Sequence, residues 1–214
     1  MKTTLLDLSH TIEDGLVTYK GLPAPVVCDY MSHVASREHY GEGTEFHIGE
    51  IRMVSNTGTY IDTPFHRFPE GIDLADLPLS SVAALEGILV SVADGRRVVD
   101  VDVFRHVDVS GKAVLVETGW DRHWGTDRYF ENHPYLTGAA AEYLVASGAS
   151  LVGIDSLNID DTDDPLRPVH TVLLGSGVPV VEHLRGLRAL RNRSFVFHAV
   201  PVKVRGMGTF PVRA

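Results

Sequence analysis

Short runs of β-branched and other apolar residues, each bounded by turn-forming residues, restrict the fold of this 214-residue chain more than any other feature. Such runs are typical of strands, because branched side chains pack well on a pleated surface. The sequence therefore predicts strands at residues 87–92, 113–117, 150–154, 178–181 and 194–204.

One segment has the period of a helix instead. In LTGAAAEYLVASG, residues 136–148, apolar residues share one face, Thr137 is a suitable N-cap and Gly148 a suitable end. Shorter helices are expected around residues 78–85 and 169–174. A helix followed directly by an apolar strand is typical of an α/β domain. No repeat or low-complexity tract divides the chain, so we expect a single domain over residues 1–214.

The amino-acid composition restricts the kinds of molecule that this chain is expected to bind. The formal net charge is −9 and the basic residues are dispersed, which disfavours a nucleic-acid surface and favours a small-molecule substrate. Cys28 is the only cysteine, so neither an internal disulfide nor a multi-thiolate zinc site is expected. Neither a secretory apolar region nor a segment of about 20 apolar residues occurs. We expect a cytoplasmic protein that does not insert into a membrane.

The stretch NTGTYIDTPFHRF, residues 56–68, places the carboxylate of Asp62 and the imidazole of His66 on either side of Pro64. A straight strand at ~3.3 Å per residue would separate Asp62 from His66 by about 13 Å. That is too far for two ligands that each bond one ion at ~2 Å. Proline removes a ladder donor and favours a strand end. We therefore expect the chain to turn at Pro64 and bring His66 back toward Asp62.

Further metal ligands must come from elsewhere, because two ligands bind an ion weakly. His170 and Glu182 flank the segment HTVLLGSGVPVVE, where His170 would open a short helix and Glu182 would end a buried strand. Two histidines and two carboxylates form a set suited to one divalent metal, zinc first and manganese as the alternative. The candidate metal ligands are Asp62, His66, His170 and Glu182.

The stretch NTGTYIDTPFH resembles the signature H-x-G-T-H-x-D-x-P-x-H of the cyclase family of metal-dependent hydrolases, which includes bacterial kynurenine formamidase and isatin hydrolase. Further similar segments follow in order: LLDLSH, PEGIDLADLPL, VLVETGW, LVGIDS and the His170 and Glu182 pair. The resemblance implies an α/β protein of the swivelling β/β/α type with a mixed, barrel-like sheet. It also implies a homodimer or homotetramer.

The family's first two histidines fall on Asn56 and Tyr60, whereas the rest of the signature matches at Gly58, Thr59, Asp62, Pro64 and His66. By the precedent of family members with two zinc ions, one metal site is lost here and the four candidate ligands keep the other. By the precedent of members with one metal, the lost histidines are themselves ligands and no adequate set remains.

The family resemblance also implies hydrolysis of a formamide, ring amide or related small substrate. A bound zinc lowers the pKa of its water to roughly 7 and polarises the carbonyl that the water attacks. Glu182 would be a ligand or the general base, and His66 a ligand or a proton shuttle. Tyr60 would donate a hydrogen bond to the developing oxyanion, or would simply fill the space of the lost histidine.

Four residues are candidates for substrate contact: Tyr19, Asn56, Phe65 and Trp120. Asn56 has the alternative of bracing its turn. Trp120 lies in an aromatic cluster after an expected strand end, where it would form a wall for a planar substrate or pack beneath the loop. The aspartates at 160, 161, 163 and 164 lack the glycine and glutamate of a calcium loop, so we expect a solvated acidic loop.

Two other functions remain open from the sequence. The first is a cyclase or dehydratase of secondary metabolism, in which His66, Tyr60 and Glu182 perform acid and base steps without hydrolysis. The second is a non-catalytic, ligand-binding relative whose metal site has decayed.

Overall fold

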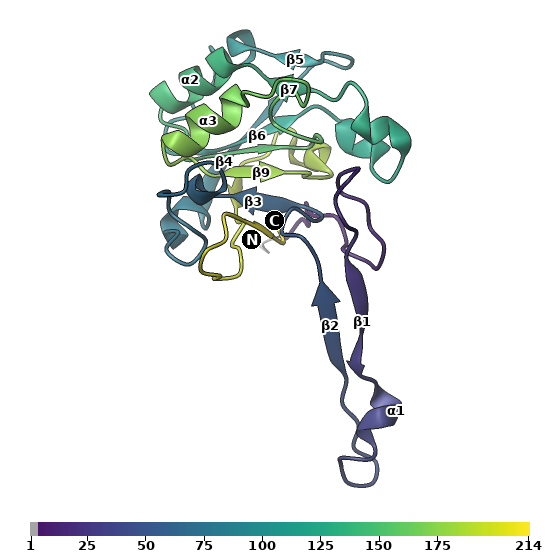
Figure 1. Ribbon diagram of the computed structural model, residues 1–214. Coiled ribbons are helices and arrows are strands. Elements are labelled where there is room, and N and C mark those ends of the chain that lie inside the picture. Colours follow the sequence, from purple (N-terminus) through teal and green to yellow (C-terminus); the bar gives the residue numbers. More distant parts are fainter. Residues whose placement is uncertain (1–3) are drawn as a thin grey trace.

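The body of the molecule is built on one mixed β-sheet, seen in a computed structural model that describes residues 4–214 (Figure 1). The spatial order of its seven strands is β10 (Phe195–Phe197), β4 (Leu85–Ser91), β6 (Ala113–Glu117), β8 (Leu151–Ile154), β9 (Val180–Glu182), β3 (Tyr60–Asp62) and β11 (Thr209–Pro211). Strands β4, β6, β8 and β9 pair in parallel, whereas β10, β3 and β11 pair antiparallel. The expected α/β class with a mixed sheet is confirmed.

The sheet is open among the residues that the structure describes, because β10 and β11 form its two edges and do not pair with each other. The barrel-like closure expected from the resemblance is therefore absent over residues 4–214. Strand β10 ends at Phe197, although a strand was expected through residue 204. Pro201 interrupts that segment and has no backbone N–H for a ladder.

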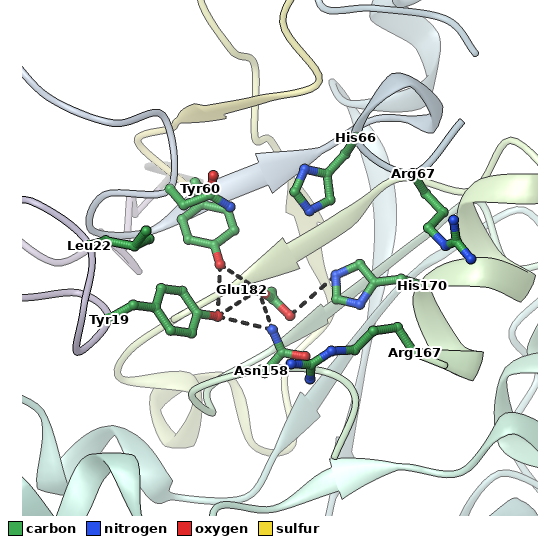
Figure 2. A pocket seen from close by; sticks show the side chains of 10 residues that line it. Tyr19, Leu22, Tyr60, His66, Arg67, Asn158, Arg167, His170 and Glu182 are labelled. Carbon is green, nitrogen blue, oxygen red and sulfur yellow. Dashed lines mark hydrogen bonds and ion pairs between the residues drawn. The ribbon is translucent and has the colours of Figure 1, made fainter. Parts of the chain in front are cut away.

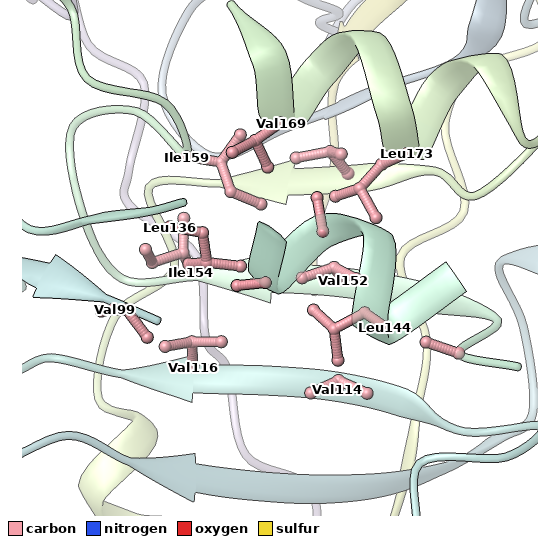
Figure 3. Close-up of a cluster of buried hydrophobic side chains, with 14 of the residues drawn as sticks. Val99, Val114, Val116, Leu136, Leu144, Val152, Ile154, Ile159, Val169 and Leu173 are labelled. Carbon is pink, nitrogen blue, oxygen red and sulfur yellow. The ribbon is translucent and has the colours of Figure 1, made fainter. Parts of the chain in front are cut away.

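Two helices cover one face of the sheet, α2 (Gly138–Ala146) and α3 (Pro168–Gly175) (Figure 1). Val114 and Val152 point toward this layer and pack with Leu144 of α2 and Leu173 of α3 (Figure 3). The alternate residue Leu115 belongs to a second buried cluster. Because both faces of the central strands are buried, these strands appear in the sequence as continuous apolar runs.

Most of the expected elements are confirmed. Strand β6 has the expected bounds, β4, β8 and β9 differ only at their ends, and α3 covers the helix expected around 169–174. Thr137 caps α2 by accepting a hydrogen bond from the Ala140 backbone nitrogen at 3.0 Å. The helix expected around 78–85 is wrong. Only a 3-10 turn, Leu79–Ser81, forms there, and Ala84 has a left-handed φ of 56° that ends it before β4.

A long arm extends away from the body (Figure 1). It consists of the antiparallel pair β1 (Val26–Met31) and β2 (Ile48–Arg52), with the single-turn helix α1 (His33–Ser36) at its far end. A third small sheet pairs β5 (Val98–Val99) with β7 (Tyr135–Leu136) in parallel. Neither pair was expected from the sequence. Within residues 4–214, no helix combines the length and the apolar character that crossing a membrane requires.

Candidate metal centre

The centre begins where β3 ends. Asp62 is the last residue of β3, which pairs with β9 on one side and β11 on the other, and only 1% of Asp62 is exposed. The next residues form a 3-10 turn, Pro64–His66. This turn brings His66 Nδ1 to 3.7 Å from Asp62 Oδ1. The bend expected at Pro64 is therefore confirmed, and it has the expected effect on His66.

His170 reaches the same place from the first turn of α3. Its Nε2 atom lies 3.6 Å from Asp62 Oδ2 and 3.6 Å from Glu182 Oε1. Glu182 ends β9 and sits opposite Tyr60 in the strand register. Asp62, His66 and His170 form the tightest group, in which one ligand atom from each lies within 4.8 Å of the others. Figure 2 shows both imidazoles turned toward the centre of the site.

Both imidazoles are held by their Nδ1 atoms. His170 Nδ1 is 2.6 Å from Asp160 Oδ2, and a carboxylate can only accept, so His170 donates. Thr209 Oγ1 lies between Asp62 Oδ1 and His66 Nδ1, at 2.8 Å from the latter. Its single proton goes to Asp62, so His66 donates to Thr209 from Nδ1. Each ring is thereby oriented as metal-ligating histidines commonly are, and Nε2 of His170 faces Asp62 and Glu182.

The charge around His170 favours a cation. Burial lowers the pKa of His170, but its hydrogen bond to Asp160 and the nearby charges of Asp62 and Glu182 outweigh burial and raise that pKa to about 10. Three carboxylates around one buried imidazole therefore demand positive charge. Either a proton on His170 or a metal ion supplies it.

Asp62 contributes a buried carboxylate oxygen that can bind a cation. Its Oδ2 atom is buried and has no hydrogen-bond partner among the described residues. Leaving a buried carboxylate oxygen without a partner is costly, so such an atom calls for a ligand. With two imidazole nitrogens nearby, the donor set fits a divalent ion such as zinc. The residues present therefore fit the metal that the resemblance implies.

Glu182 lies beside this group and is occupied by hydrogen bonds. Its Oε2 accepts from Tyr60 Oη at 2.6 Å and from Asn158 Nδ2 at 3.3 Å, and its Oε1 accepts from the Ile159 backbone at 2.7 Å. Burial, reinforced by the charge of Asp62, raises the pKa of Glu182 to about 7 despite the opposing effect of His170. Burial and the charge of Glu182 raise the pKa of Tyr60 well above its usual value, so its phenol is neutral.

These groups open into a cavity of about 330 Å³, lined by Tyr19, Leu22, Asn56, Tyr60, His66, Arg67, Asn158, Arg167, His170 and Glu182 (Figure 2). Two of the expected substrate contacts, Tyr19 and Asn56, are among the lining residues. Phe65 and Trp120 are not. Trp120 is 8% exposed, and its Nε1 donates to the Tyr129 carbonyl oxygen at 3.0 Å. It packs beneath the loop with Tyr129 and Leu157, which is the alternative that the sequence left open.

Several residues at the site were missed. Asp160 was expected in a solvated loop, yet it is fully buried and accepts hydrogen bonds from Val169 N and His170 N at the start of α3. Asp160 is not adjacent to the start of α3, where Arg167 is the N-cap residue, so no local capping pattern in the sequence pointed to it. Thr209 gave no local signal, because it is 147 residues from Asp62. Asn158, Arg67 and Arg167 were also not anticipated.

Comparison with known proteins identifies the family of this chain. The Cyclase family model, described as "Putative cyclase", matches residues 6–161. Kynurenine formamidase from Geobacillus thermodenitrificans (strain NG80-2) is 26% identical over 216 residues, which span 100% of this chain and 97% of that protein. The kynurenine formamidase of Bacillus cytotoxicus (strain DSM 22905 / CIP 110041 / 391-98 / NVH 391-98) is 27% identical over 213 residues, spanning 98% and 95%.

Solved structures share the fold. A protein described as a potential metal-dependent hydrolase with cyclase activity superposes with a TM-score of 0.76 at 25% identity, over 97% of this chain and 94% of that chain. Isatin hydrolase A from Labrenzia aggregata superposes with a TM-score of 0.81 at 18% identity, over 97% and 91%. The family model covers residues 6–161, which is most of the chain, so this chain belongs to the Cyclase family.

Proposed function

We propose that the protein is a metal-dependent hydrolase of a small amide, either a formamide or a lactam. One observation carries the proposal. The unpartnered, buried Oδ2 of Asp62 faces the imidazole of His170 in a cavity that also contains the hydrogen-bonded Tyr60 and Glu182 pair. The relatives named kynurenine formamidase and isatin hydrolase support a formamide or a cyclic amide as the substrate class.

Asp62, His66 and His170 would hold the metal, through one carboxylate oxygen and two imidazole nitrogens. This set suits zinc, with manganese as the alternative. A divalent ion there would supply Lewis acidity toward the substrate carbonyl and would make a water molecule more acidic.

Glu182 is the best placed general base. Its carboxylate is buried beside the three candidate ligands, and burial raises its pKa from the usual value of a carboxyl toward the range that suits proton transfer. It therefore takes a proton from the attacking water and later returns that proton to the leaving nitrogen. Its hydrogen bonds make it a better candidate for this role than for that of a fourth ligand.

Tyr60 contributes through its neutral phenol. In the resting site it donates its only proton to Glu182 Oε2. When Glu182 has gained a proton, this bond weakens and Tyr60 can donate to the oxyanion that develops on the substrate. Tyr19 is held beside it by donating to the Leu157 carbonyl oxygen at 2.7 Å.

Steady-state kinetics with formanilide and isatin test the hydrolase. The metal-loaded protein should hydrolyse at least one of them, and Glu182→Gln should lower kcat by about 100-fold or more. His106→Ala is the matched control, because His106 is exposed and does not line the cavity. Hydrolysis of neither compound, or an unchanged rate in Glu182→Gln, would contradict the proposal.

The Tyr60 and Glu182 pair also supports a second candidate, a cyclase or dehydratase. A hydrogen bond of 2.6 Å joins a phenol to a carboxylate there, and both groups can take part in acid and base steps. Such an enzyme should keep its activity after dialysis against a chelator, whereas the proposed hydrolase should lose it. A protein that binds ligands without turning them over would match the non-catalytic alternative.

A further inference from the structure

Two arginines face the same cavity as the candidate metal ligands. Arg67 follows the 3-10 turn of His66, and Arg167 precedes the first residue of α3. In Figure 2 Arg67 lies beyond His170, the guanidinium of Arg167 reaches toward Asn158, and Tyr60 lies on the opposite side of His170. The ion pairs formed within residues 4–214 involve other arginines, for example Arg97 with Asp161. The positive charges of Arg67 and Arg167 are therefore not compensated by a carboxylate of the described chain.

Hydrogen bonds to backbone carbonyl groups hold the Arg167 side chain in place, but no carboxylate of the described residues neutralises its charge. Its Nη1 donates to the Asp161 carbonyl oxygen at 3.0 Å and its Nη2 to the Thr162 carbonyl oxygen at 3.3 Å. The neighbouring side-chain carboxylates are engaged elsewhere, that of Asp160 by His170 and that of Asp161 by Arg97. Since a guanidinium has five N–H donors, three of those on Arg167 are available to a ligand.

Arg67 is held in a similar way. Its Nε donates to Thr171 Oγ1 at 3.2 Å, and its guanidinium lies 5.5 Å from the centre of the Phe68 ring. Among the described residues its two terminal nitrogens make no hydrogen bond. They present the fork geometry that suits a carboxylate.

From this arrangement we infer that the substrate is an anionic amide, with a carboxylate that Arg67 and Arg167 bind while the amide lies between the candidate metal ligands and Tyr60. The inference rests on the proposed hydrolase function and adds a substrate class to it. The chain has a net charge of −9, and the centre itself contains Asp62, Asp160 and Glu182. An anion would be repelled from such a site unless dedicated cations received it.

A matched pair of substrates tests the inference in the metal-loaded full-length protein. 3-Formamidobenzoate and formanilide share the ring and the formamide and differ in the carboxylate. The wild type should show a KM at least about tenfold lower for 3-formamidobenzoate. Arg67→Gln and Arg167→Gln should each raise that KM by about tenfold, and should raise the KM for formanilide far less.

Arg193→Gln is the control for the charge change. Arg193 is exposed, lies outside the cavity and forms no ion pair among the described residues. It should leave both substrates unaffected, and thermal melting should show that all three variants are folded. Equal KM values for the two substrates in the wild type, or equal losses with both substrates in the arginine variants, would overturn the inference.

A binding measurement separates this inference from the proposed function. Isothermal titration calorimetry with benzoate and benzamide needs no turnover, so it remains decisive even when neither formamide is hydrolysed. Benzoate should bind more tightly than benzamide, and Arg67→Gln or Arg167→Gln should weaken benzoate about tenfold whereas Arg193→Gln should not. Benzoate affinity that matches benzamide, or that the cavity arginines do not change, would refute the anion site whatever the enzymatic outcome.

Discussion

Thr209 and Asp160 determine how the two imidazoles of the centre are presented. Each accepts a hydrogen bond from an Nδ1 atom, Thr209 from His66 and Asp160 from His170. Thr209 also donates to Asp62, so a single hydroxyl orients two of the three candidate ligands. Partners of this kind fix the tautomer and the ring orientation on which metal affinity depends.

Replacing Thr209 by valine keeps the shape of the side chain and removes the hydroxyl. We expect Thr209→Val to weaken zinc affinity by about 10- to 100-fold, because His66 and Asp62 lose the group that orients them. Competition with a chromophoric chelator measures this affinity. Thr44→Val, at an exposed threonine of the arm, is the control. Equal zinc affinity in Thr209→Val and wild type would show that the hydroxyl does not organise the site.

At the scale of elements, the turn that carries His66 is packed directly against the chain that enters β11. The Thr63 backbone nitrogen donates to the Gly208 carbonyl oxygen at 2.7 Å. A Cβ atom on Gly208 would overlap the backbone of Phe65 and His66, and backbone atoms cannot move aside as a side chain does. Glycine is therefore required there for close approach of two backbones.

Gly208→Ala should consequently push the turn away from Asp62. We expect the variant to lose most of its bound metal and to be destabilised by about 1 to 3 kcal/mol, as overpacking commonly costs. Metal analysis and urea unfolding measure the two effects. Gly41→Ala is the control, because no heavy atom lies within 4 Å of the Cβ it would add. Full metal content in Gly208→Ala would contradict this role of the contact.

The sequence predicted elements whose signal is local. Strand β6 is buried on both faces and α2 has a capping threonine, so both could be located from their own residues. The bend at Pro64 followed from proline stereochemistry. Strand β3, of three residues, is defined by partners far away in the chain, and every residue of β2 is exposed. Neither segment shows the sustained alternation of apolar and polar residues on which strand prediction from sequence depends.

The site residues, like the secondary-structure elements, could be predicted only where their signal is local in the sequence. Asp62, His66, His170 and Glu182 could be assembled from a motif and a flanking pair. Thr209 and the two cavity arginines could not, because their roles depend on contacts across the fold and on which carboxylates are already engaged.

At the scale of the whole molecule, the arm gives a reason to propose the homodimer or homotetramer expected from the resemblance. Val27 and Ile51 are register partners on it and are 44% and 50% exposed. Tyr30, on the same arm, is 74% exposed. An isolated two-stranded ribbon is marginally stable in water, and exposed apolar patches commonly mark contact surfaces. We propose that a second copy of the chain covers this arm.

Light scattering after size exclusion tests the role of the arm. The wild type should be at least a dimer, and the double variant Val27→Glu with Ile51→Glu should be a monomer, because two buried charges at an interface would lack partners. A monomeric wild type, or a double variant with unchanged mass, would contradict the proposal.

The central claim is that Asp62, His66 and His170 hold a divalent metal, and metal content measured by mass spectrometry on protein purified without chelator tests it most directly. We predict about one divalent ion per chain. The ion should be lost in Asp62→Asn and His170→Ala and retained in His106→Ala. Wild-type protein without a stoichiometric ion, or His170→Ala with the same metal content as wild type, would contradict the account.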